Sequence, residues 1–83
     1  MYVIKLISHS QKDLDQIPPK IFTRLKDAIA ALSQNPRPHC SQKLTSHEGY
    51  RIRIGDYRIL YRIDDKAKEI YIYRVKHRRD AYR

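Results

Sequence analysis

The sequence predicts a small α+β domain with the element order β-α-α-β-β-β, in which an N-terminal helical hairpin packs on a small, mainly antiparallel sheet. Apolar residues recur at three- and four-residue spacing between residues 19 and 34, which is the period of an amphipathic helix. Apolar and basic residues alternate between residues 50 and 63, which is the period of a strand with one buried face. The 83 residues contain no repeat, linker or low-complexity segment, so we expect one domain over residues 1–83.

The first element is a strand over residues 2–7, and a short helix follows it. The stretch from Ser10 to Asp13 resembles a capping box, in which the Ser10 hydroxyl accepts the Asp13 amide and the carboxylate suits the positive end of the helix. Pro18 ends this helix, because a proline disfavours helical geometry in the residue before it.

The second helix is the clearest one in the chain. Pro19 fits its first turn, and it ends near Asn35 and Pro36. Its apolar face consists of Ile21, Leu25, Ala28, Ile29 and Leu32. The two helices form an antiparallel hairpin that needs a sheet to cover its apolar side.

A β-hairpin around Gly55 and Asp56 organises the second half. Gly55 supplies a positive φ at the first central position of a two-residue turn. The predicted register places Arg53 opposite Arg58, and it also pairs Ile54 with Tyr57, Ile52 with Ile59 and Arg51 with Leu60. Arg51, Arg53 and Arg58 therefore share one face, and the opposite face carries Tyr50, Ile52, Ile54, Tyr57, Ile59, Tyr61 and Ile63.

The shared basic face suggests an anion site. Like charges directly opposite one another on a sheet are destabilising, and a fold does not need that repulsion. The alternative is a solvated basic face on a basic protein.

The remaining segments complete the sheet. Residues 36–49 are polar and loop-like, with a short extended piece around Lys43 and Leu44. Residues 64–68 form a charged turn, residues 69–75 a last strand that is apolar on both faces, and residues 77–83 a tail.

The charge of the chain favours an acidic or nucleic-acid partner. Its formal net charge is +9, and residues 50–83 hold eleven of the eighteen Lys and Arg and six of the seven Tyr. Interleaved aromatic and basic residues suit RNA, whose bases stack on rings while its phosphates meet Arg. Tyr is also a good strand residue, which by itself accounts for several of the seven.

The single cysteine excludes an intramolecular disulfide, so a reducing cytoplasm is the expectation. Cys40 is interpreted as a small hydrophobic residue beneath a loop. The apolar run over residues 3–7 is too short for a signal peptide or a membrane span. Neither a metal nor a cofactor is expected, because His39, Cys40, His47 and His77 lack a metal-ligand spacing and the acidic residues are scattered.

The basic face and the tail together are the candidate for chemistry. Arg78 follows the last strand, and His77, Arg79 and Tyr82 could reach the same end of the sheet. Arginine forks bind phosphate and stabilise the charge of a pentacoordinate phosphorus. Arginine is a poor general base, so proton transfer falls to Tyr82, His77 or the RNA itself. The alternative is a basic tail that docks on an acidic partner.

These residues resemble the RelE/ParE superfamily of bacterial and archaeal toxins, and the resemblance is closest to its RelE branch. The resemblance rests on the element order, on the run from Tyr50 to Tyr61 and on the ending from Val75 to Tyr82. It implies the toxin of a type II toxin-antitoxin pair that enters the ribosomal A site and cleaves mRNA there without a metal. It also implies a neutralising antitoxin and contact with operator DNA only through the antitoxin complex.

The resemblance further implies roles for individual residues. Arg58 would hold the scissile phosphate, Arg78 would assist the leaving oxygen and Tyr82 would orient or deprotonate the 2′-hydroxyl. Arg51 and Arg53 would stabilise charge and grip RNA; some relatives have Lys at these two places. His77 is a candidate acid or base. Further contacts with RNA or the ribosome fall to Arg62, Lys76, Arg79 and Arg83.

Two other functions remain open. The same fold in a ParE-like toxin inhibits DNA gyrase without catalysis. An inactive module that binds RNA or an antitoxin is the third hypothesis, and a neighbouring gene for a short protein with an acidic, helical half would favour a toxin pair.

Overall fold

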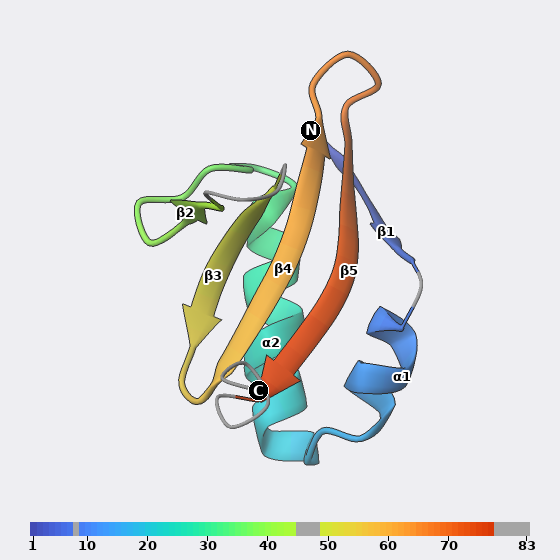
Figure 1. Cartoon of the computed structure of the whole chain (residues 1–83), viewed down its shortest axis with the longest axis vertical. Helices are drawn as coiled ribbons and strands as arrows, with labels where there is room; N and C mark the ends of the chain where they lie inside the picture. The colour runs from blue at the N-terminus through green and yellow to red at the C-terminus, as the bar shows by residue number, and fades with distance from the viewer. Residues whose placement is uncertain (8, 45–48, 78–83) are drawn as a thin grey trace.

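The chain folds as two helices on one mixed sheet. The computed structural model describes residues 1–7, 9–44 and 49–77. The sheet has five strands in the order β1-β5-β4-β3-β2 (Figure 1). In chain order the elements are β1 (Val3–Leu6), α1 (Ser10–Asp15), α2 (Pro19–Leu32), β2 (Gln42–Lys43), β3 (Tyr50–Ile54), β4 (Tyr57–Asp64) and β5 (Glu69–His77).

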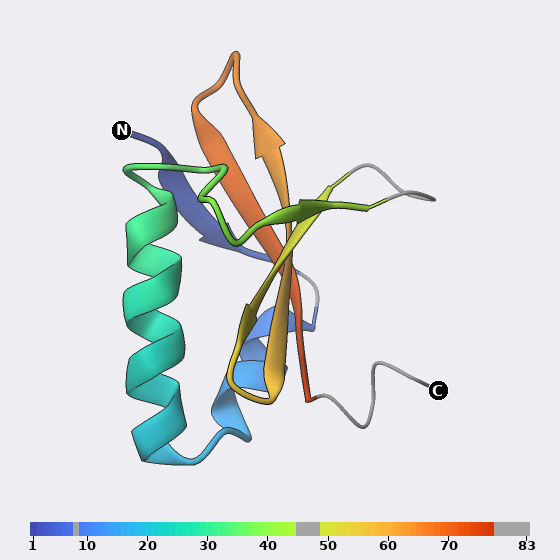
Figure 2. The same cartoon turned by 90° about the vertical axis from the view of Figure 1, so that its left-hand side faces the viewer.

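This arrangement confirms the predicted α+β fold and adds the two-residue strand β2 to it. Strands β2 to β5 pair antiparallel with their neighbours, whereas β1 pairs parallel with β5 at one edge. The long helix α2 lies along one face of the sheet, and the opposite face, here named the outer face, is left uncovered by it (Figure 2).

The core lies between α2 and the sheet. Its buried residues come from α1, from α2 and from the central strands: Leu14, Leu25, Ile29, Leu32, Ile52, Ile59, Tyr61, Ile70, Ile72 and Val75. The three contributors from α2 are three or four residues apart and the two from β4 are two residues apart, as the periods of helix and strand predict. Burying a large side chain of this kind contributes about 1.5–3 kcal/mol, so this layer holds α2 on the sheet.

The predicted capping box at Ser10 is wrong. Ser10 is fully buried in the first turn of α1, and its hydroxyl donates to the Ile7 carbonyl at 2.8 Å. The Asp13 carboxylate instead accepts from Arg74 Nε and from the Val75 amide, both at 2.9 Å. The reason is an open edge: β1 pairs only with residues 69–72 of β5, so the Val75 amide needs another acceptor.

A bulge changes which residues of β5 point into the core. Leu60 pairs with Arg74 but Tyr61 pairs with Ile72, so Tyr73 is an extra residue in the ladder. Before the bulge Ile72 points into the core, and after it Val75 does so. The strand also continues two residues further than predicted, to His77. No helix in the described part of the chain is long and apolar enough to cross a membrane.

Candidate anion-binding site

The predicted register of the β3–β4 hairpin is confirmed, and β5 pairs with β4 on the side away from β3. Gly55 has a φ of +59° in the turn, and Arg53 lies directly opposite Arg58. On the other side of β4, Arg58 lies directly opposite Lys76. Because residues paired across strands share a face, Arg53, Arg58 and Lys76 form a row across three strands, here named the cation row.

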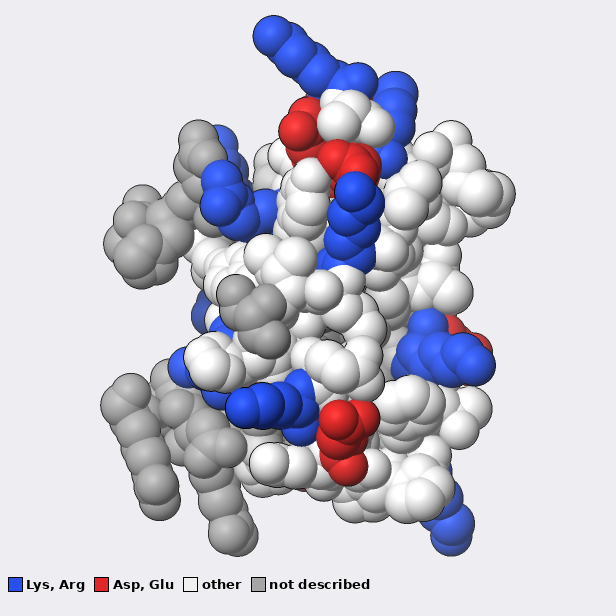
Figure 3. Space-filling model, turned by 90° about the vertical axis from the view of Figure 1, so that its right-hand side faces the viewer, with Lys and Arg blue, Asp and Glu red and all other residues white. Residues whose placement is uncertain are grey.

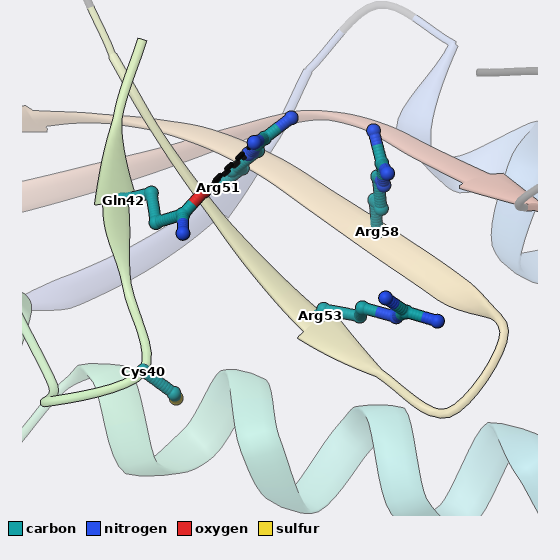
Figure 4. A pocket seen from close by; sticks show the side chains of 5 residues that line it. All are labelled: Cys40, Gln42, Arg51, Arg53 and Arg58. Carbon is teal, nitrogen blue, oxygen red and sulfur yellow. Dashed lines mark hydrogen bonds between the residues drawn. The ribbon is translucent and has the colours of Figure 1, made fainter. Parts of the chain in front are cut away.

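A pocket adjoins the cation row on the outer face. It has a volume of about 200 Å³ and is named the polar pocket; its lining consists of Cys40, Gln42, Arg51, Arg53 and Arg58 (Figure 4). Arg51 lies two residues before Arg53 on β3 and so shares its face. Three guanidinium groups from two neighbouring strands therefore gather at one pocket.

The acceptors that hold two of these guanidinium groups are uncharged. Gln42 Oε1 accepts from Arg51 Nε at 3.1 Å and from Arg51 Nη2 at 2.7 Å. Arg53 Nε donates to the Gly55 carbonyl at 3.3 Å. These bonds orient the two side chains without neutralising them, which leaves the pocket suited to a phosphate that accepts paired N–H donors.

Several basic residues that do not line the polar pocket pair with carboxylates. Arg74 pairs with Asp13 and Arg37 with Asp65, each at 2.9 Å, and Lys5 pairs with Glu69. Viewed from the side of β1, the surface accordingly shows acidic side chains interspersed with basic ones (Figure 3). The polar pocket differs because three arginines gather around it, namely Arg51, Arg53 and Arg58.

The loop between α2 and β2 is tied to the sheet, and this positions Gln42. The buried Tyr61 hydroxyl donates to the Pro36 carbonyl at 2.8 Å, and burial raises the pKa of Tyr61 to about 12. Arg37 donates to both carboxylate oxygens of Asp65, at 2.9 and 3.3 Å, and thereby lowers the pKa of Asp65 to about 2. These contacts fix the loop from which β2 starts.

His77 does not join the arginines. It pairs with Tyr57, and the two rings meet edge to face with centroids 5.1 Å apart. Tyr57 packs against the core cluster, so His77 lies on the helix-covered side of the sheet and Arg58 on the outer face. The physical reason is the bulge at Tyr73, which sets the facing of every later residue of β5.

The structure places the other predicted residues as follows. Arg62 is exposed on the outer face of β4 and Lys76 is in the cation row. Arg78, Arg79, Tyr82 and Arg83 lie outside the described residues. Among the described residues, no group of three or more His, Cys, Asp or Glu is arranged to hold a metal ion.

The expectation of a Cys40 beneath a loop is wrong, because Cys40 is exposed. The partly buried residues of that loop are Pro36, Pro38 and Ser41, and the Ser41 hydroxyl donates to the Pro38 carbonyl at 2.7 Å. Gln42 is the site residue that the sequence did not reveal. A two-residue strand has no periodicity from which its pairing could be read.

The comparisons with known proteins agree with this fold. A family model of the ParE toxin of type II toxin-antitoxin systems (parDE) matches residues 4–82. Toxin RelG of Mycobacterium tuberculosis is 34% identical over 84 residues, which cover 99% of this chain and 97% of the relative.

Solved structures give the same family. The crystal structure of the toxin-antitoxin complex RelBE2 from Mycobacterium tuberculosis matches with a TM-score of 0.82 and 31% identity, covering 93% of this chain and 98% of that one. The archaeal RelE-RelB complex from Pyrococcus horikoshii matches with a TM-score of 0.78 and 28% identity, covering 93% and 94%. The chain therefore belongs to the ParE toxin family, within the RelE/ParE superfamily of type II toxin-antitoxin systems.

Proposed function

We propose that this toxin is a ribosome-dependent mRNA endonuclease. The observation that supports it is the cation row beside the polar pocket: Arg58 lies between Arg53 and Lys76 in register, with Arg51 at the neighbouring position. A phosphate bound there would meet several fixed donors at once, and such preorganised donors stabilise charge that develops in a transition state.

The proposed reaction is an internal transfer of the phosphate. The ribose 2′-oxygen forms a bond to the adjacent phosphorus while the bond from phosphorus to the 5′-oxygen breaks. The 2′-hydroxyl loses a proton and the leaving 5′-oxygen gains one, so the products are a 2′,3′-cyclic phosphate and a 5′-hydroxyl. The pentacoordinate phosphorus carries extra negative charge, which a cluster of arginines stabilises.

The roles of Arg51, Arg53 and Arg58 rest on their places beside the polar pocket, and those of Arg78 and Tyr82 rest on the resemblance to the family. Arg58, at the centre of the row, holds the scissile phosphate, and Arg51 and Arg53 stabilise its charge. Arg78 assists the leaving oxygen. We assign the proton of the 2′-hydroxyl to Tyr82 rather than to His77, because the His77 ring contacts Tyr57 on the helix-covered side.

The partners follow from the family. We propose that a cognate antitoxin neutralises this toxin, since the related RelBE2 and RelE-RelB structures are toxin-antitoxin complexes. Operator DNA would be met only through that complex. The ribosome and mRNA would meet Arg62, Lys76, Arg79 and Arg83, and the site of action is the cytoplasm.

A cell-free translation reaction tests the endonuclease. A defined mRNA is translated with the wild-type toxin, Arg58→Ala or Arg24→Ala, and the mRNA is then mapped by primer extension. We expect cuts within codons that require ribosomes, vanish in Arg58→Ala and persist in Arg24→Ala, whose side chain is exposed on α2. Intact mRNA with the wild type, or cuts that persist in Arg58→Ala, would overturn the proposal.

The second candidate function is inhibition of DNA gyrase. The observation that favours it is the family model itself, which describes a ParE toxin. A supercoiling assay with purified gyrase separates the two candidates, because a gyrase inhibitor blocks supercoiling and leaves translated mRNA intact. If both assays were negative, the outer face would be a binding surface alone.

A further inference from the structure

An apolar residue lies in the middle of the arginines of the outer face. Leu60 pairs with Arg51 on β3 and with Arg74 on β5, and Arg58 and Arg62 lie two residues before and after it on β4. Leu60 is half-buried. Arginines suffice to bind phosphate groups. The leucine among them therefore offers a contact for a less polar part of a ligand.

A second cavity lies over this leucine. It has a volume of about 180 Å³ and is named the apolar cavity; its lining consists of Leu44, Arg51, Arg58, Leu60 and Lys76. Leu44 comes from the segment after β2, where its amide donates to the Gly49 carbonyl at 3.0 Å. The two leucines therefore approach from different segments and form apolar walls between cationic groups.

The apolar cavity and the polar pocket share two residues. Arg51 and Arg58 line both of them, so a group in one lies next to a group in the other. On one side of the shared arginines lie Gln42 and Arg53, and on the other lie the two leucines beside Lys76. A polar compartment next to one with leucine walls matches a chain in which phosphates alternate with bases.

We propose that the apolar cavity is a subsite for one nucleobase of single-stranded RNA, adjacent to the phosphate in the polar pocket. This rests on the proposed function in taking RNA as the ligand. A base has apolar faces that fit against Leu44 and Leu60, and its flanking phosphates need cations beside it, which Arg51, Arg58 and Lys76 supply. The volume suits one ring system rather than a whole helix of a partner.

Fluorescence anisotropy with two matched strands tests the subsite. One probe is a short single-stranded RNA with 2′-O-methyl groups, which cannot be cleaved, and the other is the same strand with its internal bases removed. We expect the wild type to prefer the strand with bases by about fivefold. Leu60→Thr, which keeps a residue suited to a strand, abolishes most of that preference and leaves the affinity for the abasic strand unchanged.

Two further variants keep the test independent of folding. Leu44→Ala changes the other wall and should reduce the preference as well. Leu6→Thr is the matched control, because Leu6 is a strand leucine that is 41% exposed on β1 and lines neither compartment. It should retain the full preference.

Two outcomes would overturn the subsite. Equal affinity of the wild type for both strands would exclude a base from the apolar cavity. An acidic segment of a protein would then be the alternative occupant. Equal weakening of both strands by Leu60→Thr would show that the leucine supports the sheet rather than a base. Because the assay needs neither ribosomes nor cleavage, its failure is distinguishable from intact mRNA in the translation assay.

Discussion

Gln42 holds Arg51 by two hydrogen bonds to a single oxygen, at 3.1 Å from Nε and 2.7 Å from Nη2. The two residues are directly opposite each other in the β2–β3 ladder. A guanidinium group is planar, so two bonds to one side of it set the direction of its remaining N–H donors. Gln42 is thus a positioning residue for Arg51.

Gln42→Ala should lower the rate of mRNA cleavage by about two- to tenfold, the range expected for lost hydrogen bonds of this kind. The measurement is the single-turnover rate in the translation reaction. Gln11→Ala is the control, because Gln11 donates to Asp15 within α1. If Gln42 acts through Arg51, adding Gln42→Ala to Arg51→Ala should cost nothing further; an additive loss would contradict this role.

Arg53→Ala should flatten the salt dependence of RNA binding. Each phosphate neutralised on a single strand adds about 0.7 to the slope of log K against log salt, so the loss of one contact should lower the slope by about that amount. The measurement is anisotropy over a series of salt concentrations. Lys26→Ala, on the exposed side of α2, should leave the slope unchanged, and an unchanged slope for Arg53→Ala would remove that residue from the phosphate contacts.

Asp13→Asn should lower the free energy of unfolding by about 1–2 kcal/mol, because the carboxylate serves both Arg74 and the edge amide of Val75. Urea denaturation at neutral pH measures the change. Asp15→Asn is the matched control on the same helix, since Asp15 is exposed and accepts only from Gln11 in the described contacts. Equal effects of the two substitutions would show that the edge contact adds no stability.

Asp65 should make stability fall in acid. Arg37 and the Tyr2 hydroxyl lower the pKa of Asp65 from 3.8 to about 2 in the folded chain, so the unfolded chain binds the proton more readily. The stabilising contribution is therefore complete above the unfolded pKa and is lost as the pH falls from 3.8 toward about 2.

Thermal unfolding of the wild type and Asp65→Asn across this pH range checks the expectation. The difference in Tm between them should be largest near neutral pH and should shrink as the pH falls toward about 2, where Asp65 itself becomes protonated in the folded chain. A difference that stayed constant with pH would show that the Asp65 charge does not contribute to stability.

The sequence by itself determined the β3–β4 hairpin and its basic face. Gly55 permits the turn, and period-two alternation on both sides of it places Arg51, Arg53 and Arg58 together. The spacing of apolar residues likewise determined α2, whose buried residues Leu25, Ile29 and Leu32 all belong to the predicted apolar face. These features depend on neighbours in the chain, and local patterns therefore reveal them.

Only the tertiary structure decided which further residues reach that face. Lys76 lies in the cation row and His77 lies on the opposite face of the sheet, because Tyr73 is an extra residue in β5. The position of this bulge depends on the pairing of β5 with β4 rather than on a local sequence pattern. The Asp13 carboxylate binds Arg74 instead of capping its own helix, because β1 pairs with only half of β5 and leaves the rest of that edge without a neighbouring strand. Gln42 meets Arg51 because Tyr61 and Arg37 tie down the preceding loop, and contacts between such distant segments form only when the whole sheet assembles.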